Sequence, residues 1–302
     1  MLFRSPGTTS CPPSLFVEKR QVGAGHHVDA RGSTRFLGKP RLPQLWGPMA
    51  GTALLERRVM WRVGTVVALH HETSTARTIT LKVRDWPGHV AGQHVDVHLT
   101  ASDGYSAVRS YSIASAPNSE GHVELTVERL PDGEVSPYLT QELAVSDRLE
   151  LRGPIGGWFV WRPQQPEPIQ LIAGGSGIVP FMAMIRSRVA AGSTAPFRLL
   201  YSVRESGAIF YRAELQALSE HNSPVSLTYA YTRAAPKDWP RPPGRIDAAL
   251  IAETTWPSTL APTYYVCGPT SFVEVAAGLL TTSGNSPNRI KTERFGPTGD
   301  RR

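Results

Sequence analysis

Cysteine is scarce in this sequence, whose 302 residues include only Cys11 and Cys267. Two cysteines cannot form the disulfide framework of a small secreted domain, and they favour a reducing compartment, so we expect a cytoplasmic protein. A cysteine-ligated iron–sulfur cluster needs four ligands and is likewise excluded from this chain. Any iron–sulfur partner is therefore expected to be a separate polypeptide.

Long apolar runs are missing as well. No stretch approaches the roughly 20 residues that span a bilayer. The apolar segment Ser14–Val17 is too short for the core of a secretory signal. The sequence also lacks a Gly-x-Ser-x-Gly nucleophile elbow, so nothing supports the triad chemistry of a hydrolase.

Charge of one sign is concentrated at the N-terminal end. Residues 1–48 hold seven basic and two acidic side chains and so contribute +5 of the formal charge of +7, which leaves +2 for the other 254 residues. A region this close to neutral has no stripe that would follow a phosphate backbone. We therefore expect no binding of nucleic acid.

The same N-terminal segment, residues 1–48, contains six prolines and six glycines without any sustained period of 2 or 3.6. We interpret residues 1–56 as a disordered or mis-assigned extension. The arginines would suit a transit peptide, but the prolines would break its amphipathic helix. We favour a translation start at Met49 or Met60, where patterned sequence begins.

From Trp61 onward, short segments rich in Val, Thr and Leu alternate with turns such as Trp86-Pro87-Gly88 and Asp103-Gly104. This pattern predicts a small antiparallel β-barrel over residues 57–161. A short helix is expected at Ser136–Leu143, with Ser136 as its cap and Pro137 at its first position. The expected strands are Arg62–His70, Ala76–Val83, Gln93–Leu99 and His122–Arg129.

A linker with three prolines, Arg162–Pro168, precedes a region in which strands and helices alternate. Such alternation predicts an α/β domain with a mainly parallel sheet over residues 162–302. The fold class is thus a two-domain one, an antiparallel β-barrel followed by a parallel-sheet nucleotide-binding domain. The expected strands are Ile169–Ala173, Phe197–Ser202, Val225–Tyr231, Tyr264–Cys267 and Arg289–Arg294, and the expected helices are Val179–Ala190, Tyr211–Glu220, Ile246–Ala252 and Ser271–Leu280.

The segment Arg109-Ser110-Tyr111-Ser112 has the residue types of a flavin cradle. Residues two apart on a strand face the same side, so Arg109 and Tyr111 can meet one ligand. A guanidinium binds phosphate with forked geometry, Tyr111 could lie against an aromatic ring, and Ser112 could hydrogen-bond a ring nitrogen. Taken alone, these residues fit a surface arginine beside a core tyrosine better.

A glycine turn before a helix, Gly133-Glu134-Val135-Ser136, strengthens the flavin interpretation. The N–H groups at a helix start suit a diphosphate, although an ordinary helix start has the same sequence. The second glycine segment, Gly174-Gly175-Ser176-Gly177-Ile178-Val179-Pro180, follows a strand and opens a helix, the context required for phosphate binding. Pro180 stands where the standard fingerprint has its third glycine, so a plain strand-to-helix turn is equally compatible.

Three further segments end strands at the edge where ligands bind in such sheets. Arg204 and Arg233 would suit the 2′-phosphate of NADP, whereas Glu205 could bind the ribose of NAD. Cys267-Gly268-Pro269 combines a small thiol with a glycine, which would admit a nicotinamide ring close to a flavin. The same cysteine also fits a buried structural position.

A metal site is suggested by three residues that alternate along one expected strand, His94, Asp96 and His98. Strand spacing separates His94 from His98 by roughly 13 Å, which is too far for one ion. No metal is expected.

Together and in this order, the motifs resemble the ferredoxin–NADP reductase superfamily of flavoprotein oxidoreductases over roughly Trp61 to Gly299. The tetrapeptides Gly153-Pro154-Ile155-Gly156 and Glu293-Arg294-Phe295-Gly296 also match. The resemblance implies hydride transfer from NADP(H) or NAD(H), with NADPH favoured, to FAD bound in the barrel. It also implies no fused iron–sulfur domain and a separate electron acceptor of iron–sulfur, haem or molybdenum type.

By the same resemblance, Arg109 holds the flavin phosphate, Tyr111 stacks on the isoalloxazine, and Ser112 lies near N5. Glu293 and Phe295 cover the other flavin face. The implied catalytic residues are Ser112, Cys267, Glu293 and Phe295. The implied cofactor-binding residues are Arg109, Ser110, Tyr111, Ser112, Gly133, Val135, Ser136, Gly174, Gly175, Gly177, Ile178, Arg204, Arg233, Cys267, Gly268 and Pro269.

Two positions depart from the family pattern. Val179 stands where the family often has threonine, and Phe295 is followed by a short tail instead of being a terminal tyrosine. Two alternatives stay open: a free flavin reductase that releases its flavin, and a non-catalytic subunit that senses redox state.

Overall fold

The computed structural model describes residues 60–100, 105–118, 120–131, 133–220 and 225–296. Both of its sheets belong to one compact unit, Glu56–Arg302. The predicted extension, residues 1–56, lies outside the described residues, as do the Asp103-Gly104 turn and the possible start at Met49.

An antiparallel sheet of six strands forms the first part of this unit, in the order β4-β3-β6-β1-β2-β5. Its two outer strands meet, because Ile113 bridges Leu125 and the Ala114 N–H donates to the Glu124 carbonyl at 2.8 Å. This contact closes the sheet and confirms the predicted barrel. The strands are β1 (Trp61–His71), β2 (Ala76–Val83), β3 (His94–Thr100), β4 (Ser106–Ser112), β5 (His122–Glu128) and β6 (Arg148–Ile155).

Alternation along these strands builds the barrel core. On β3, Val95 and Val97 are fully buried, and on β6, Leu149 and Leu151 lie in the same cluster. Strand β6 was not predicted as a strand, although its charged residues and leucines alternate as a half-buried strand requires. Strand β4 carries the Arg109–Ser112 motif.

The predicted helix at Ser136–Leu143 is wrong in its start and its type. A three-residue helix, α1 (Val135–Pro137), continues into the π-helical turn η1 (Tyr138–Glu142), and the residue before the helix is Glu134. Ser136 therefore lies inside the helix, not at its cap, and Pro137 is its third residue, not its first. The Ser136 hydroxyl instead accepts the Leu130 N–H at 3.0 Å, which ties down the preceding loop.

The second sheet is parallel throughout, with the order β11-β10-β7-β8-β9. The direction in which successive strands are added reverses between β7 and β10, so the carboxyl ends of these two strands form the switch point where such sheets bind ligands. The strands are β7 (Ile169–Gly174), β8 (Phe197–Val203), β9 (Val225–Tyr231), β10 (Thr263–Pro269) and β11 (Ile290–Phe295). The predicted linker, Arg162–Pro168, has no helix or strand, and the predicted domain limit at residues 161 and 162 stays a prediction.

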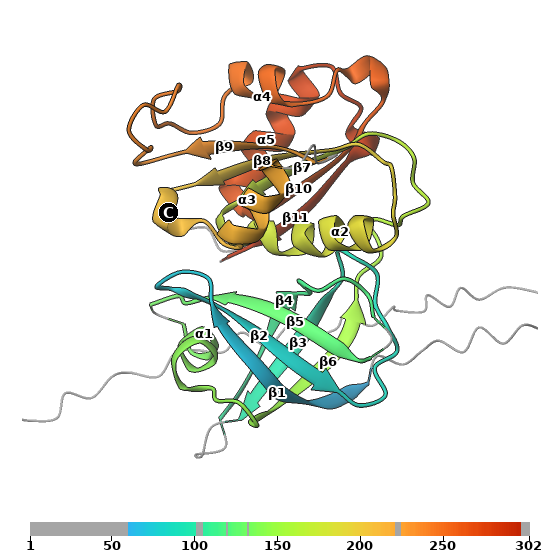
Figure 1. Cartoon of the computed structure of the whole chain (residues 1–302), viewed down its shortest axis with the longest axis vertical. Helices are drawn as coiled ribbons and strands as arrows, with labels where there is room; N and C mark the ends of the chain where they lie inside the picture. Colours follow the sequence, from blue (N-terminus) through green and yellow to red (C-terminus); the bar gives the residue numbers. More distant parts are fainter. Residues whose placement is uncertain (1–59, 101–104, 119, 132, 221–224, 297–302) are drawn as a thin grey trace, which may run out of the picture. The chain divides into compact units, whose positions relative to one another are not determined.

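Helices cover both faces of the parallel sheet, as predicted. Figure 1 shows α2 (Val179–Ala190) and α3 (Arg212–Glu220) on one face, and α4 (Ala248–Thr254) and α5 (Thr270–Thr282) on the other. Each pair packs on its own apolar cluster. Helix α4 starts two residues later than predicted because the Asp247 carboxylate caps it, accepting the Leu250 N–H at 2.7 Å. Short 3-10 turns are η2 (Gly175–Ile178), η3 (Ser206–Ala208), η4 (Ser258–Leu260) and η5 (Pro287–Arg289).

One apolar cluster joins the barrel to the parallel sheet. Phe159 meets Tyr265 edge-on at 5.4 Å between ring centroids, and Trp161 meets Phe197 at 5.1 Å. The two sheets therefore meet over a packed core. Among the residues that the structure describes, each helix is too short or too polar to cross a bilayer.

Candidate active site

The glycines after β7 have two different reasons to be glycine. Gly175 has a φ of +55°, and a Cβ built on it would meet nothing within 4 Å, so this residue makes a left-handed turn beside open space. A Cβ on Gly177 would instead lie 2.1 Å from the Cys267 carbonyl oxygen. Gly177 thus lets the turn η2 pack against the backbone of β10.

Phe272, in the first turn of α5, explains two other glycines. A Cβ on Gly174 would lie 2.7 Å from the Phe272 ring, and one on Gly268 would lie 2.8 Å from it. The ring therefore lies over the ends of β7 and β10, at the switch point of the sheet. Phe272 was not among the predicted site residues; the available signal was the pair of glycines at or next to the ends of the two strands, Gly174 and Gly268.

A cavity of about 360 Å³ opens at these strand ends. Five of the predicted site residues line it, namely Gly174, Gly175, Arg204, Pro269 and Phe295. Arg233 is exposed and follows Thr232, which lines the cavity. The backbone N–H of Arg233 donates to the Arg204 carbonyl at 3.0 Å. The barrel contributes Glu128 and three residues of the turn between β1 and β2, Thr73, Ser74 and Thr75, none of which sequence reasoning identified. The remaining lining residues are Ser176, Ser202, Val203, Glu205, Gly207, Ala208, Phe210 and Phe272.

Three of the predicted catalytic residues come together beside this cavity. The Ser112 hydroxyl, at the end of β4, donates to the Glu293 carboxylate of β11 at 3.0 Å. Glu293 pairs in register with Cys267 on β10. Two residues further along β11, Phe295 lines the cavity. Because Ser112 belongs to the flavin motif and Glu293 to this strand, their hydrogen bond connects the flavin motif to the edge of the parallel sheet where the nucleotide cavity lies.

Burial raises the pKa values of Glu293 and Cys267. Removal from water raises the pKa of the Glu293 carboxyl to about 7, although the hydrogen bond from Ser112 opposes the change. Burial, together with the neighbouring Glu293 charge, raises the pKa of the Cys267 thiol well above its ordinary value. Near neutral pH, Glu293 can therefore hold or release a proton at the Ser112 oxygen, whereas Cys267 stays a neutral thiol.

In the other half of the flavin motif, Arg109 is open to solvent and Tyr111 is largely buried. Arg109 makes a long ion pair of 3.4 Å with Glu134, and both side chains are more than half exposed. Exposed pairs of this kind contribute little, so the guanidinium is available for a phosphate. Tyr111 packs against the barrel core, and burial raises its pKa to about 12, so its hydroxyl stays protonated.

Several predicted cofactor residues have side chains engaged elsewhere. The Ser110 hydroxyl donates to Asp96 at 2.7 Å, and the Val135 and Ile178 side chains lie in the cores of their domains. These residues can offer only backbone groups or a shared hydroxyl to a ligand. Gly133 is constrained by Ser136, whose hydroxyl oxygen would lie 2.8 Å from a Cβ on that glycine.

Two of the three residues that suggested a metal, His98 and Asp96, have separate partners. His98 bonds Glu150 at 2.6 Å, and Asp96 accepts a bond of the same length from Arg152. Within the described part of the chain, no cluster of three or more His, Cys, Asp or Glu side chains could hold an ion.

Comparison with known families matches residues 63–160 to the oxidoreductase FAD-binding domain and residues 171–278 to the oxidoreductase NAD-binding domain. The chain belongs to the ferredoxin–NADP reductase superfamily. As a member, it is a flavoprotein oxidoreductase with one domain for FAD and one for a nicotinamide dinucleotide.

Individual relatives of this chain carry the names of reductases or reductase components. The reductase component of the naphthalene 1,2-dioxygenase/salicylate 5-hydroxylase systems of Ralstonia sp is 28% identical over 240 residues, covering 78% of this chain and 69% of the relative. The glycine betaine monooxygenase reductase subunit of Chromohalobacter salexigens is 28% identical over 209 residues, 68% of this chain and 56% of that protein. The crystal structure of an Amycolatopsis cytochrome P450 reductase matches with a TM-score of 0.68 at 25% identity, covering 80% of this chain and 71% of that one. The chain spans little more than half the length of several curated relatives that it matches.

The residues present fit both cofactors of the family. For FAD, the exposed Arg109 stands two residues from Tyr111, which packs against the barrel core, and Ser112 contacts Glu293 at the end of the same strand. For the dinucleotide, Gly175 faces open space, Arg204 supplies a positive charge, and Phe272 and Phe295 supply apolar walls. This combination of cation, open backbone and aromatic rings suits a phosphate joined to a flat ring.

Proposed function

We propose that this reductase transfers hydride from NAD(P)H to bound FAD and passes the electrons to a separate protein. The contact between Ser112 and Glu293 carries the proposal, because it joins the flavin motif of the barrel to the strand that lines the nucleotide cavity. A ring bound at Tyr111 and a ring bound in the cavity would thus meet at Ser112. Direct transfer needs the reacting atoms within about 3–3.5 Å of each other.

FAD, when bound, supplies the redox chemistry by accepting a hydride and releasing electrons singly. The chain's own residues bind and orient it: Arg109 would hold the flavin phosphate, Tyr111 would face the ring, and Ser112 would lie near N5. The backbone N–H groups around Ser136 would contact the diphosphate. Glu293, whose pKa is raised to about 7, exchanges protons at the Ser112 hydroxyl, and beside it the buried Cys267 stays a neutral thiol.

The acceptor is proposed to be an iron–sulfur or haem protein. Matched relatives are named as reductases of dioxygenase, monooxygenase and cytochrome P450 systems, and these names support a separate redox partner. A molybdenum protein, which also takes electrons one at a time, is the third candidate acceptor. The scarcity of cysteine in this sequence supports an acceptor whose metal ligands come from another polypeptide, and it favours the reducing cytoplasm.

NADPH is the favoured donor because Arg204 lines the cavity at the end of β8, with Arg233 nearby. If Arg204 binds the 2′-phosphate, Arg204→Ala weakens NADPH use by about 1.5–3 kcal/mol, the value of a hydrogen bond to a charged group, and leaves NADH use nearly unchanged. Stopped-flow reduction of the flavin by each nucleotide measures this difference. Arg241→Ala, which removes an arginine bonded to Asp247 and Glu253, is the control. Equal losses with both nucleotides would reject the assignment.

Flavin retention tests the proposed function against its nearest rivals. We expect the purified chain to carry FAD through gel filtration and to reduce an artificial acceptor with NADPH. A free flavin reductase would lose its flavin on the column. A redox-sensing subunit would keep its ligand and fail to reduce the acceptor.

A further inference from the structure

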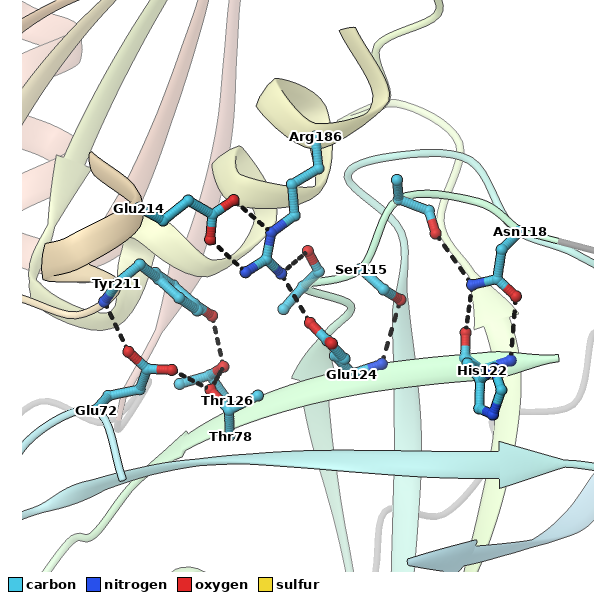
Figure 2. A network of polar contacts seen from close by, with 12 residues as sticks. Glu72, Thr78, Ser115, Asn118, His122, Glu124, Thr126, Arg186, Tyr211 and Glu214 are labelled. Carbon is cyan, nitrogen blue, oxygen red and sulfur yellow. Dashed lines mark hydrogen bonds and ion pairs between the residues drawn. The ribbon is translucent and has the colours of Figure 1, made fainter. Parts of the chain in front are cut away.

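A polar network crosses from the parallel-sheet domain to the barrel, and Arg186 of α2 is at its centre (Figure 2). The guanidinium binds Glu214 of α3 with two parallel bonds, Nε to Oε1 at 2.9 Å and Nη2 to Oε2 at 2.6 Å. Its Nη1 donates across the junction to the Glu124 carboxylate at 2.8 Å and to the Ala114 carbonyl at 3.0 Å. One side chain therefore fastens two helices to the barrel.

The two ends of this connection lie close in sequence to the two cofactor motifs. Ala114 follows Ser112, the residue that contacts Glu293, by two positions. Helix α2, which carries Arg186, begins directly after the turn Gly175–Ile178. Arg186 thus links the end of the flavin motif to the helix that follows the nucleotide loop.

The electrostatics favour this link over a loose surface pair. The Arg186 side chain is 23% exposed, and it faces two carboxylates. Burial acts to lower its pKa, but the bonds and charges of Glu214 and Glu124 outweigh burial and raise it. Its guanidinium also lies 5.1 Å from the ring centroid of Tyr211. A planar, forked donor is needed to satisfy both carboxylates at once.

A second set of bonds fixes the same junction at Tyr211, where α3 begins. The Glu72 carboxylate accepts the Tyr211 N–H at 2.7 Å and the Thr78 hydroxyl at 2.6 Å. Because Thr78 donates to Glu72, the Thr126 hydroxyl donates to Thr78 and accepts from the Tyr211 hydroxyl, which closes a ring of four residues. Tyr211 has a φ of +54°, a rare conformation for a residue with a side chain, and such residues persist where their surroundings fix them. Its neighbour Phe210 lines the nucleotide cavity.

We propose that Arg186 is a positioning residue for hydride transfer: its bonds to Glu124 and the Ala114 carbonyl hold the nucleotide-binding domain at the separation from the flavin motif that the reaction requires. The inference rests on the proposed function. Arg186 acts through the elements that it joins, and its loss therefore slows transfer between bound cofactors more than it weakens their binding.

The test uses the full chain loaded with FAD and measures flavin reduction by NADPH in the absence of oxygen. In Arg186→Met, which keeps the apolar stem and loses the fork, we expect the limiting reduction rate to fall ~10- to 100-fold, since a displacement near 1 Å costs this much. FAD content and the NADPH concentration for half-maximal rate stay near those of the parent. Arg186→Lys keeps the charge and gives an intermediate rate. The matched control is Arg241→Met, which removes an arginine that also bridges two carboxylates but within one domain, and it keeps the parent rate.

If Arg186→Met does not fold, two milder variants test the same proposal. Glu124→Gln removes the carboxylate on the barrel side of the junction, whereas Glu214→Gln removes the one on the same domain as Arg186. We expect Glu124→Gln to slow reduction more. A parent rate in Glu124→Gln, or in folded and flavin-replete Arg186→Met, would overturn the inference, as would an equal loss in Arg241→Met. A parent chain that binds no FAD or is not reduced would instead overturn the proposed function.

Discussion

Gly177→Ala is expected to cost about 3 kcal/mol of unfolding free energy, at the upper end of what overpacking does. The new Cβ would lie 2.1 Å from the carbonyl oxygen and 2.5 Å from the carbonyl carbon of Cys267, and both belong to the backbone of a central strand. No side chain can rotate away to relieve this clash, so η2 has to move. Urea unfolding measures the loss.

The same displacement should disable nucleotide use. The turn η2 lines one side of the cavity, so its displacement would misplace the bound nucleotide. We therefore expect flavin reduction by NADPH to slow ~100-fold. Gly278→Ala is the matched control, because that glycine is exposed within α5 and a Cβ there meets nothing within 4 Å. This control should gain about 0.5–1 kcal/mol from helix propensity. An unfolding free energy unchanged by Gly177→Ala would contradict the close packing of η2 against the backbone of β10.

Glu293→Gln is expected to slow turnover with a one-electron acceptor by ~10²-fold, the lower limit for loss of a general acid–base group. Glutamine keeps the shape and can still accept the Ser112 hydrogen bond, but it exchanges no proton. Because the pKa of Glu293 is about 7, the parent rate should change with pH around neutrality and the variant rate should not. Steady-state pH profiles of both proteins test this, and parallel profiles would remove Glu293 from the proton path.

The same substitution predicts a change in the pH dependence of stability. The Glu293 pKa is raised from 4.5 to about 7 on folding, so the native chain binds the extra proton and loses stability as the pH rises through this range. The loss is at most about 3 kcal/mol and is complete above pH 7. Glu293→Gln lacks it, so the advantage of the variant over the parent should grow from pH 5 to pH 8. Urea unfolding of both proteins without added cofactor at the two pH values measures the difference.

The spacing of apolar residues and the residue types at turns were sufficient to predict the order of the two domains and the positions of most helices and strands. The helix Val179–Ala190 and the strand Val225–Tyr231 were predicted with their observed bounds, since strong apolar patterns and clear flanking turns mark both. Local capping was harder to predict. Ser136 looks like a cap but bonds back to Leu130, whereas Asp247 caps α4, whose first residue lies two positions beyond the predicted start.

Contacts between residues far apart in the chain could not be predicted from the sequence around either residue. The role of Gly177 depends on the backbone of β10, which lies some ninety residues later in the chain. The partners of Arg186 come from positions 28, 62 and 72 residues away, and nothing around Arg186 distinguishes it from a surface arginine. The motif residues could be named from their types and order; which of their side chains are free for a ligand depended on packing, as Ser110 and Ile178 show.

Direct hydride transfer at the barrel–sheet junction is tested best by rapid reduction of the FAD-loaded chain with NADPH carrying deuterium at the transferred C4 position. We expect the flavin absorbance to bleach in a phase that saturates with nucleotide and slows markedly with deuterium, because the C4 bond breaks in that step. A flavin-loaded chain that neither NADPH nor NADH bleaches would contradict the account.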